Sequence, residues 1–202
     1  MDKKIVKIFR LIAFLTAFAG IEITFIAGNW TITEFFNGFT SWSNILLTVY
    51  FFITCFLFDF RIGVWSNKDH VKSALLLYII IVGATYHFLL SMTWEPKGFL
   101  LWGVNIQHYL TPILMLIDWL LLKPSTKIKF KHTVLWLIFP IAYALFTIIR
   151  GSLTGQYPYY FFHVGNLGVI QVLINMIGFL CVFLILGNLI AFINNLRLKL
   201  FK

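Results

Sequence analysis

Long runs of apolar residues alternate with short polar segments along the whole chain. Each run is close to the roughly 20 residues that a helix needs to cross the hydrocarbon core of a bilayer. The connections between the runs are too short for a folded domain outside the membrane. The pattern therefore predicts one all-α domain over residues 1–202, a polytopic membrane protein built as a six-transmembrane-helix bundle. We expect its helices at about residues 5–27, 39–58, 73–93, 99–122, 133–149 and 167–192.

The first apolar run also has features of a secretory signal peptide. A basic segment, Met1–Arg10, precedes it, and Ala17-Phe18-Ala19 matches the small-residue pattern of a cleavage site. The apolar run continues beyond this pattern to Ala27, which is longer than the apolar region of a usual signal peptide. We expect the segment to be retained as the first membrane helix, with cleavage as the alternative.

Composition agrees with a membrane protein and changes the interpretation of its charge. Apolar residues make up 60% of the chain and charged residues 11%, and the mean hydropathy is +0.90. A soluble domain carries about 25% charged residues. The net charge of +9 lies in short clusters between apolar runs, which favours contact with anionic lipid headgroups over nucleic-acid binding. Cys55 and Cys181 both fall inside apolar runs and are expected to pack as small hydrophobic residues.

The basic residues also predict the orientation of the bundle. Fourteen of the 16 Lys and Arg residues fall on one side of the predicted spans, leaving Lys97 and Arg150 for the other. The positive-inside rule assigns the basic side, with both chain termini, to the cytoplasm. Lys outnumbers Arg 12 to 4, which hints at an AT-rich bacterial genome and a multi-pass protein of the bacterial plasma membrane. The basic-side residues are Lys3, Lys4, Lys7, Arg10, Arg61, Lys68, Lys72, Lys123, Lys127, Lys129, Lys131, Arg197, Lys199 and Lys202.

Polar residues of several predicted helices share one depth in the outer half of the membrane. Counting about 1.5 Å per helical residue from the cytoplasmic ends puts this layer roughly 21–27 Å away from them. Polar groups turn toward the bundle interior, because lipid offers no hydrogen-bond partner. Asp118, near the cytoplasmic end, is the main exception. The layer contains Glu22, Thr40, Ser43, Asn44, His87, His108 and Arg150.

The spacing within two helices adds detail to this layer. Thr40, Asn44 and Thr48 recur every fourth residue and share one helix face. A second stripe combines Asn105, His108, Thr111 or Pro112, and Asp118. Pro112 cannot donate to the carbonyl of His108, so we expect a kink just below the histidine.

Several of these residues also have structural interpretations. His87 could pair with Glu22, and Arg150 could extend toward lipid headgroups. Tyr157 and Tyr159 are typical of an interfacial aromatic belt.

The layer holds the components of a nucleophilic hydrolase. An alcohol becomes a good nucleophile when a neighbouring base takes its proton and a third group orients that base. Thr40 can supply the alcohol and His108 the base. Asn105, Glu22 or His87 could orient the base, and Ser43 is an alternative alcohol. His87, His108 and Glu22 could also bind a metal, but none of them are paired at a helical i, i+4 spacing. We predict neither a metal nor a cofactor.

Three segments, in order, resemble the androgen-induced gene (ADTRP-type) family of membrane proteins and its bacterial relatives. They are Phe39–Leu46, Asn105–Pro112 and Thr154–Tyr159. The resemblance implies six helices, both termini inside, and a threonine hydrolase that cleaves fatty acid esters of hydroxy fatty acids. It implies Thr40 as the nucleophile and His108 as the essential histidine. Ile106 stands where animal members carry a second histidine beside the asparagine.

Two non-enzymatic interpretations use the same layer. Glu22, His87 and His108 could form the proton relay of a carrier, although no inverted repeat or pair of Gly/Pro-broken helices is visible. Alternatively, a membrane scaffold protein could use the polar residues only to fix helix packing. The expected partners are the bilayer and, for the enzyme, a membrane lipid or fatty acyl ester.

Overall fold

The computed structural model describes residues 2–201, and within them 80% of the chain is helical and none of it forms strands. Six helices in this range are long and apolar enough to cross a membrane, as the apolar pattern predicted. They span Lys3–Ala27, Phe39–Phe56, Asp69–Leu90, Phe99–Leu121, Phe130–Thr154 and Val164–Leu200.

Several spans contain more than one helical element. The third and fourth spans each include a π-helical turn, in which the backbone hydrogen bonds run from i to i+5. The elements are α1 (Lys3–Ala27), α2 (Ile32–Phe35), α3 (Phe39–Phe56), α4 (Arg61–Ser66), α5 (Asp69–Thr85), η1 (Tyr86–Leu90), α6 (Phe99–Asn105), η2 (Ile106–Leu110), α7 (Thr111–Leu121), α8 (Phe130–Leu135), α9 (Ile138–Thr154), η3 (Tyr160–Phe162) and α10 (Val164–Leu200).

The observed helices run beyond the apolar limits where polar residues find protein partners. The last helix was predicted at about 167–192 but continues to Leu200. Its polar end is held because Asn194 and Asn195 bond the backbone of residues 126–128, and Arg197 donates to carbonyls at the end of α7. The third span begins at Asp69 instead of residue 73, with the Asp69 carboxylate accepting from the backbone and hydroxyl groups of Ser125 and Thr126.

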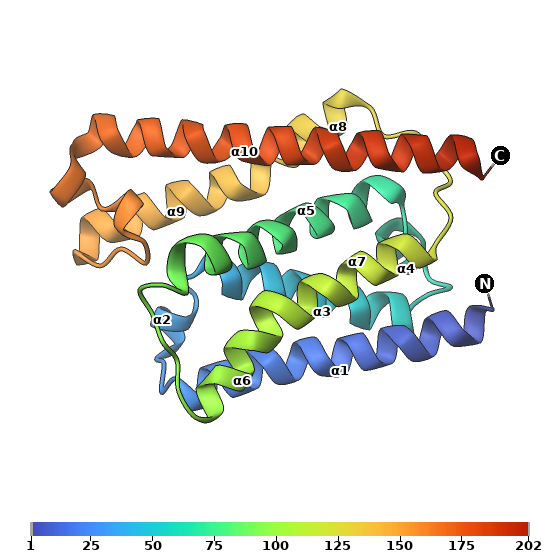
Figure 1. The fold of residues 1–202 in the computed structure, drawn as a ribbon, viewed down its shortest axis with the longest axis horizontal. Coiled ribbons are helices and arrows are strands. Elements are labelled where there is room, and N and C mark those ends of the chain that lie inside the picture. Colours follow the sequence, from blue (N-terminus) through green and yellow to red (C-terminus); the bar gives the residue numbers. More distant parts are fainter. Residues whose placement is uncertain (1, 202) are drawn as a thin grey trace.

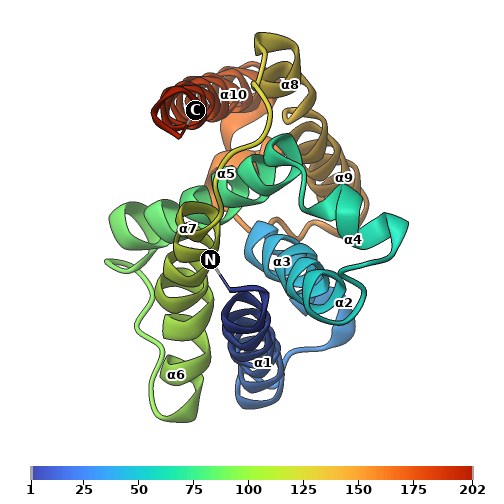
Figure 2. The same cartoon turned by 90° about the vertical axis from the view of Figure 1, so that its right-hand side faces the viewer.

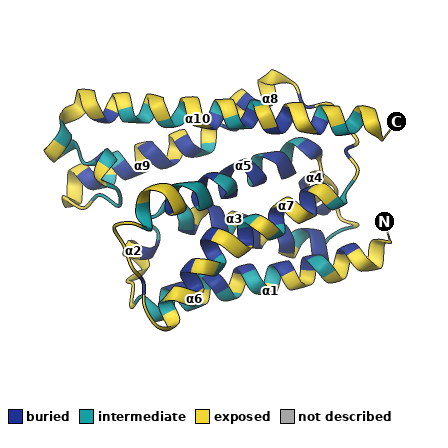
Figure 3. Ribbon diagram, in the orientation of Figure 1, coloured by how far each residue is buried: buried dark blue, intermediate teal, exposed yellow. Residues whose placement is uncertain are grey.

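Helix α5 lies at the centre of the bundle. It packs against α3 and α7 on one side and against α10 on the other, while α1 packs on α3, α6 and α7. Figure 2 shows α5 between the α9–α10 pair and the group formed by α1, α3 and α7. The described chain begins and ends at the same end of the bundle (Figure 1). Helix α10 is mostly exposed, as a helix on the lipid-facing surface of a bundle should be (Figure 3).

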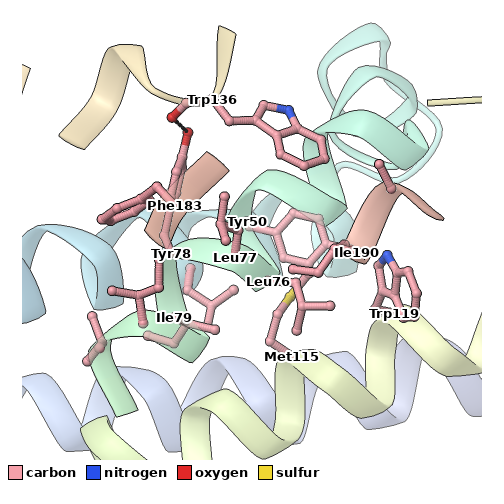
Figure 4. Close-up of a cluster of buried hydrophobic side chains, with 14 of the residues drawn as sticks. Tyr50, Leu76, Leu77, Tyr78, Ile79, Met115, Trp119, Trp136, Phe183 and Ile190 are labelled. Atoms are coloured by element: carbon pink, nitrogen blue, oxygen red, sulfur yellow. Dashed lines mark hydrogen bonds between the residues drawn. The ribbon is translucent and has the colours of Figure 1, made fainter. Parts of the chain in front are cut away.

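The apolar core surrounds α5 and connects the two sides of the bundle. Leu76, Leu77 and Ile79 of α5 are almost completely buried, and Met115 of α7 packs in the same cluster (Figure 4). The Tyr78 hydroxyl donates to the Trp136 carbonyl at 2.8 Å, in the break between α8 and α9. This hydrogen bond joins the α9–α10 pair to the central helix and gives a buried phenol the partner that it needs.

Arg10 and Asp118 form an ion pair inside the bundle. Arg10 was counted with the basic residues of the cytoplasmic side, but its side chain and that of Asp118 are 0% exposed, so it is buried in the protein and not exposed beside a loop. Arg10 Nε lies 2.7 Å from Asp118 Oδ1 and Nη2 lies 3.0 Å from Oδ2, while the Tyr50 hydroxyl donates to Oδ2 at 2.6 Å. A carboxylate and a phenol of facing helices bond Nε and Nη2 of the buried guanidinium, while Nη1 has no partner in the described chain.

Lys72 was also counted with the cytoplasmic loops and is likewise buried. Its side chain is 4% exposed and its Nζ lies 3.5 Å from Asp69 Oδ1. The lysine belongs to the first turns of α5, which the apolar pattern had assigned to a loop. The helix starts earlier because Asp69 supplies the partner that a buried ammonium group requires.

We predict that Asp118→Asn lowers the free energy of unfolding by about 3–5 kcal/mol, because it leaves the buried Arg10 charge without its carboxylate. The measurement is an unfolding titration in mixed detergent micelles. The double variant Arg10→Met/Asp118→Leu removes both charges and should recover most of the loss. If Asp118→Asn has the same unfolding midpoint in denaturant as the wild-type protein, the ion pair does not stabilise the fold.

Candidate functional site

Thr40 lies in the first turn of α3 and faces into the protein. Helix α3 begins after Gly38, which has an extended backbone and no side chain to cap the helix. The Thr40 hydroxyl Oγ1 lies 3.3 Å from Nε2 of His108, a residue 68 positions later in the chain. The structure therefore brings an alcohol and an imidazole into hydrogen-bond contact across two membrane helices.

A backbone carbonyl fixes the protonation pattern of His108. The ring nitrogen Nδ1 lies 2.8 Å from the carbonyl oxygen of Val104. A carbonyl only accepts hydrogen bonds, so Nδ1 carries the ring proton, and in the neutral imidazole Nε2 has a free lone pair. The ring of Tyr86 stacks on the imidazole with 4.2 Å between centroids, and His108 is only 6% exposed. The basic nitrogen thus points at Thr40.

His108 lies in the π-helical turn η2, where the sequence predicted a kink. Pro112 has no N–H to donate to the His108 carbonyl, and the hydroxyl of Thr111 donates to the Ile106 carbonyl at 2.7 Å. The helix widens over Ile106–Leu110, in the turn that contains the histidine. The freed carbonyl packs against Gly83 of α5, where a Cβ would lie 2.6 Å from the His108 oxygen.

Two buried amides connect this turn to its neighbouring helices. Asn44 is completely buried, and its Nδ2 lies 3.0 Å from the Thr40 carbonyl and 3.4 Å from the Gln107 carbonyl. Gln107 in turn donates to the Gly20 carbonyl of α1 at 3.0 Å. The amides therefore fix η2 relative to α1 and α3, and with it the distance between Thr40 and His108.

Tyr159 also reaches the start of α3, although the sequence suggested an interfacial belt. Its hydroxyl oxygen accepts a hydrogen bond from the Phe39 N–H at 3.2 Å. Burial raises the pKa of the Tyr159 phenol, which therefore stays protonated and able to donate. Tyr157 does not join it, because it packs against Gly151 and against the His163 ring, with a centroid separation of 4.7 Å. The aromatic-rich composition of the Tyr157–Tyr160 segment gave no signal that separates these tyrosines.

The other predicted residues lie apart from Thr40 and His108. Glu22 and Asn105 are exposed, and exposed His87 lies 3.2 Å from the Tyr109 hydroxyl through Nδ1. Among residues 2–201, no hydrogen bond or ion pair joins His87 to Glu22, and neither side chain bonds His108. The π-helical turns that begin at Tyr86 and Ile106 change the angle between successive residues, so an α-helical stripe does not extend across them.

Ser43 and Arg150 also have other surroundings. Ser43 is 2% exposed, and within the described chain its hydroxyl has no hydrogen-bond partner. Arg150 lies near Gln156, with its guanidinium 3.5 Å from the backbone oxygen and 3.4 Å from the side-chain oxygen. In the described part of the chain, no three His, Cys, Asp or Glu side chains converge as metal ligands would.

Two cavities meet at Thr40 and Tyr159. The α9–α10 cavity has a volume of about 70 Å³ and lies among α3, α5, α9 and α10. The α1–α6 cavity has a volume of about 390 Å³ and includes Glu34, Asn37 and His108 in its lining. Thr40, Leu90 and Tyr159 line both cavities. A molecule bound at Thr40 can therefore place one part on each side of the hydroxyl.

The arrangement is suited to acyl transfer. It combines an alcohol, a base with its lone pair aimed at that alcohol, and a protonated phenol beside the start of a helix. The sequence suggested the alcohol and the base from residue type and approximate depth. It gave no signal for the Val104 carbonyl as the orienting group, or for the contacts of Tyr86 and Gly83 with His108, because these depend on how the helices pack.

We predict that Gly83→Ala lowers the free energy of unfolding by about 1–3 kcal/mol, because the new methyl group meets the backbone oxygen of His108. Gly178→Ala is the matched control in α10, where a Cβ has no heavy atom within 4 Å. The control should be neutral or more stable by about 0.5–1 kcal/mol. Unfolding titrations in mixed micelles compare the two, and equal curves would argue against a tight α5–η2 contact.

Comparison of the chain with protein-family models, with curated proteins and with solved structures gives no match.

Proposed function

We propose that this protein is a membrane-embedded threonine hydrolase that cleaves lipid esters, with Thr40 as nucleophile and His108 as general base. The contact of 3.3 Å between Thr40 Oγ1 and His108 Nε2 carries the proposal. The bond from His108 Nδ1 to the Val104 carbonyl supports it, because it leaves Nε2 as the acceptor. The mostly apolar cavities on both sides of Thr40 agree with a lipid substrate.

In the first step, Thr40 Oγ1 attacks the ester carbonyl carbon while His108 Nε2 takes the hydroxyl proton. The bond from the carbonyl carbon to the alcohol oxygen breaks, and Nε2 gives its proton to the departing oxygen. The products are a free alcohol, an acyl ester on Thr40 and a neutral imidazole. The Val104 carbonyl keeps the ring oriented and stabilises the imidazolium that exists between the two proton transfers.

In the second step, a water molecule takes the place of the alcohol. His108 removes a proton from this water as its oxygen attacks the acyl carbon, and the bond to Thr40 Oγ1 breaks. The proton returns to Thr40, so ester and water have become acid and alcohol. The α1–α6 cavity, with polar side chains in its lining, is the side from which this water enters.

The start of α3 supplies stabilisation for the negative charge that develops on the carbonyl oxygen. The Ser41 and Trp42 N–H groups donate to the Gly38 carbonyl and the Phe39 N–H donates to Tyr159, so the helix start contributes through its partial positive charge. The Tyr159 hydroxyl accepts from the Phe39 N–H, so its own proton is available to the oxyanion. The helix start and the phenol beside it are held in place by the fold, as electrostatic stabilisation of a transition state requires.

The resemblance to the ADTRP-type family adds support. Each of its three motif segments contributes one side chain to the site: Thr40, His108 and Tyr159. A proton-coupled carrier has less support, since its proposed relay needs Glu22 and His87, which lie on exposed surfaces away from His108.

We predict that Thr40→Ala lowers lipid-ester hydrolysis by at least about 1,000-fold, because the nucleophile is lost. Thr40→Ser retains an alcohol and should keep measurable activity. Labelling by a fluorophosphonate probe provides the second readout, and it should disappear in Thr40→Ala. Ser43→Ala is the control, since this buried hydroxyl lines neither cavity and should be dispensable. Persistent labelling of Thr40→Ala would exclude Thr40 as the nucleophile.

The same proposal includes an orientation in the cell membrane, with both termini in the cytoplasm and the site in the outer half of the bilayer. Arg10 and Lys72 lie inside the bundle, but the remaining basic residues at the terminal end still far outnumber Lys97 and Arg150. The positive-inside rule supports this orientation.

We predict that a membrane-impermeant maleimide labels Lys97→Cys on intact cells, and labels Lys199→Cys only after permeabilisation. Both variants are made in a background with Cys55 and Cys181 replaced by serine. Labelling of Lys199→Cys on intact cells would reverse the orientation, and it would leave the chemistry at Thr40 unaffected.

A further inference from the structure

The two cavities that meet at Thr40 differ in ways that bear on the substrate. An ester has two parts, an acyl chain and an alcohol, which diverge from the carbonyl carbon. Thr40 and Tyr159 line both cavities, so a carbonyl carbon at Thr40 lies where one part can enter each. The chemistry of the two linings then decides which part goes where.

The α9–α10 cavity fits the acyl chain. Within the described part of the chain no charged side chain lines it, and most of its lining is aliphatic or aromatic, including Ala144 of α9 and Phe179 of α10. Its volume of about 70 Å³ holds only the part of a chain nearest the carbonyl. The rest of a long chain must extend beyond the cavity, and the exposed apolar surface of α10 offers it lipid surroundings.

The α1–α6 cavity is larger and has polar groups without partners. Thr24 Oγ1 and Asn37 Oδ1 are buried, and within the described chain neither has a hydrogen-bond partner. Both residues line the cavity, with a volume of about 390 Å³. Buried polar atoms are normally paired, so an occupant that carries hydroxyl groups suits this cavity.

The charge in the α1–α6 cavity further limits which class of alcohol fits there. Hydrogen bonds from the backbone and hydroxyl of Thr31 lower the pKa of Glu34, so its carboxylate is ionised at neutral pH. Among the described residues, no lysine or arginine lines the cavity; the Arg150 guanidinium acts on Glu34 from outside the lining, where it lies beside Gln156. A second carboxylate in this cavity meets an unfavourable field.

We propose that the acyl chain occupies the α9–α10 cavity and that the leaving alcohol, in the α1–α6 cavity, is neutral and hydroxyl-bearing, as in an acylglycerol. This rests on the proposed hydrolase function. The alcohol carries no carboxylate, unlike the hydroxy fatty acid part of the esters that the family resemblance implies.

The experiment uses the full-length protein in nanodiscs and two sets of esters. The first set keeps glycerol as the alcohol and varies the acyl chain from butyryl to oleoyl. The second keeps oleoyl as the acyl group and compares glycerol with 12-hydroxystearic acid as the alcohol. Ala144→Phe narrows the α9–α10 cavity, and Ala144→Leu is the milder version should the larger ring prevent folding. Ile149→Phe, on the exposed surface of α9, is the control.

Glu34→Gln tests the alcohol side with little risk to folding. Glu34 forms a capping box with Thr31, and glutamine can occupy the same position of that motif. Glu95→Gln is the matched control, since it removes a nearby exposed carboxylate that does not line the cavity. Thr40→Ala is included throughout.

We expect wild-type protein to prefer the glycerol ester, and the Ala144 variants to lower the ratio of oleoyl to butyryl hydrolysis by about tenfold. Glu34→Gln should lower the ratio of glycerol-ester to acidic-ester hydrolysis about three- to tenfold, by removing the repulsion. If the Ala144 variants change the preference between the two alcohols instead, the acyl chain and the alcohol occupy the opposite cavities. If wild-type protein hydrolyses the glycerol ester and the acidic ester at equal rates, and Glu34→Gln does not change their ratio, the proposal of a neutral leaving alcohol is wrong. Full hydrolysis by Thr40→Ala would overturn the hydrolase function itself.

Discussion

Inside a membrane, a histidine ring can be oriented only by groups of the protein, and here the Val104 carbonyl orients His108. The bond places the ring proton on Nδ1 and the lone pair on Nε2, toward Thr40. An acid such as Glu22 in that position would bring a charge into an apolar region, at a cost that a backbone carbonyl avoids. The wide turn η2 accommodates both Pro112 and the hydrogen bond from His108 to Val104, because the backbone of this turn does not depend on the N–H that Pro112 lacks.

The distance between Thr40 and His108 depends on the register of three spans, and two polar networks fix that register. Near Thr40, Asn44 and Gln107 connect α3, η2 and α1 through backbone carbonyls. Closer to the chain termini, Arg10, Tyr50 and Asp118 connect α1, α3 and α7. Apolar packing between helices has little preference for register in lipid, because lipid tails are as apolar as the helices. Hydrogen bonds at two depths of the bundle therefore fix the register of the helices.

The α9–α10 pair is attached to this group by separate contacts. The Tyr78–Trp136 bond joins it to α5, and the loop after α9 brings Tyr159 to the start of α3. The pair therefore adds the apolar cavity and the phenol to a site whose alcohol and base belong to the other helices. A mostly exposed helix such as α10 can therefore still line a cavity beside Thr40.

The sequence by itself determined the six apolar helices, because crossing a bilayer depends on the length and composition of each segment alone. It also predicted that Thr40 and His108 share one polar layer, and the structure brings their side chains to 3.3 Å. Only the tertiary structure decided that Arg10 is buried, that Glu22, His87 and Asn105 face outward, and that Tyr159 reaches α3. Those outcomes depend on how the helices pack against one another and on partners distant in the chain, such as Asp118 for Arg10, which no local pattern contains.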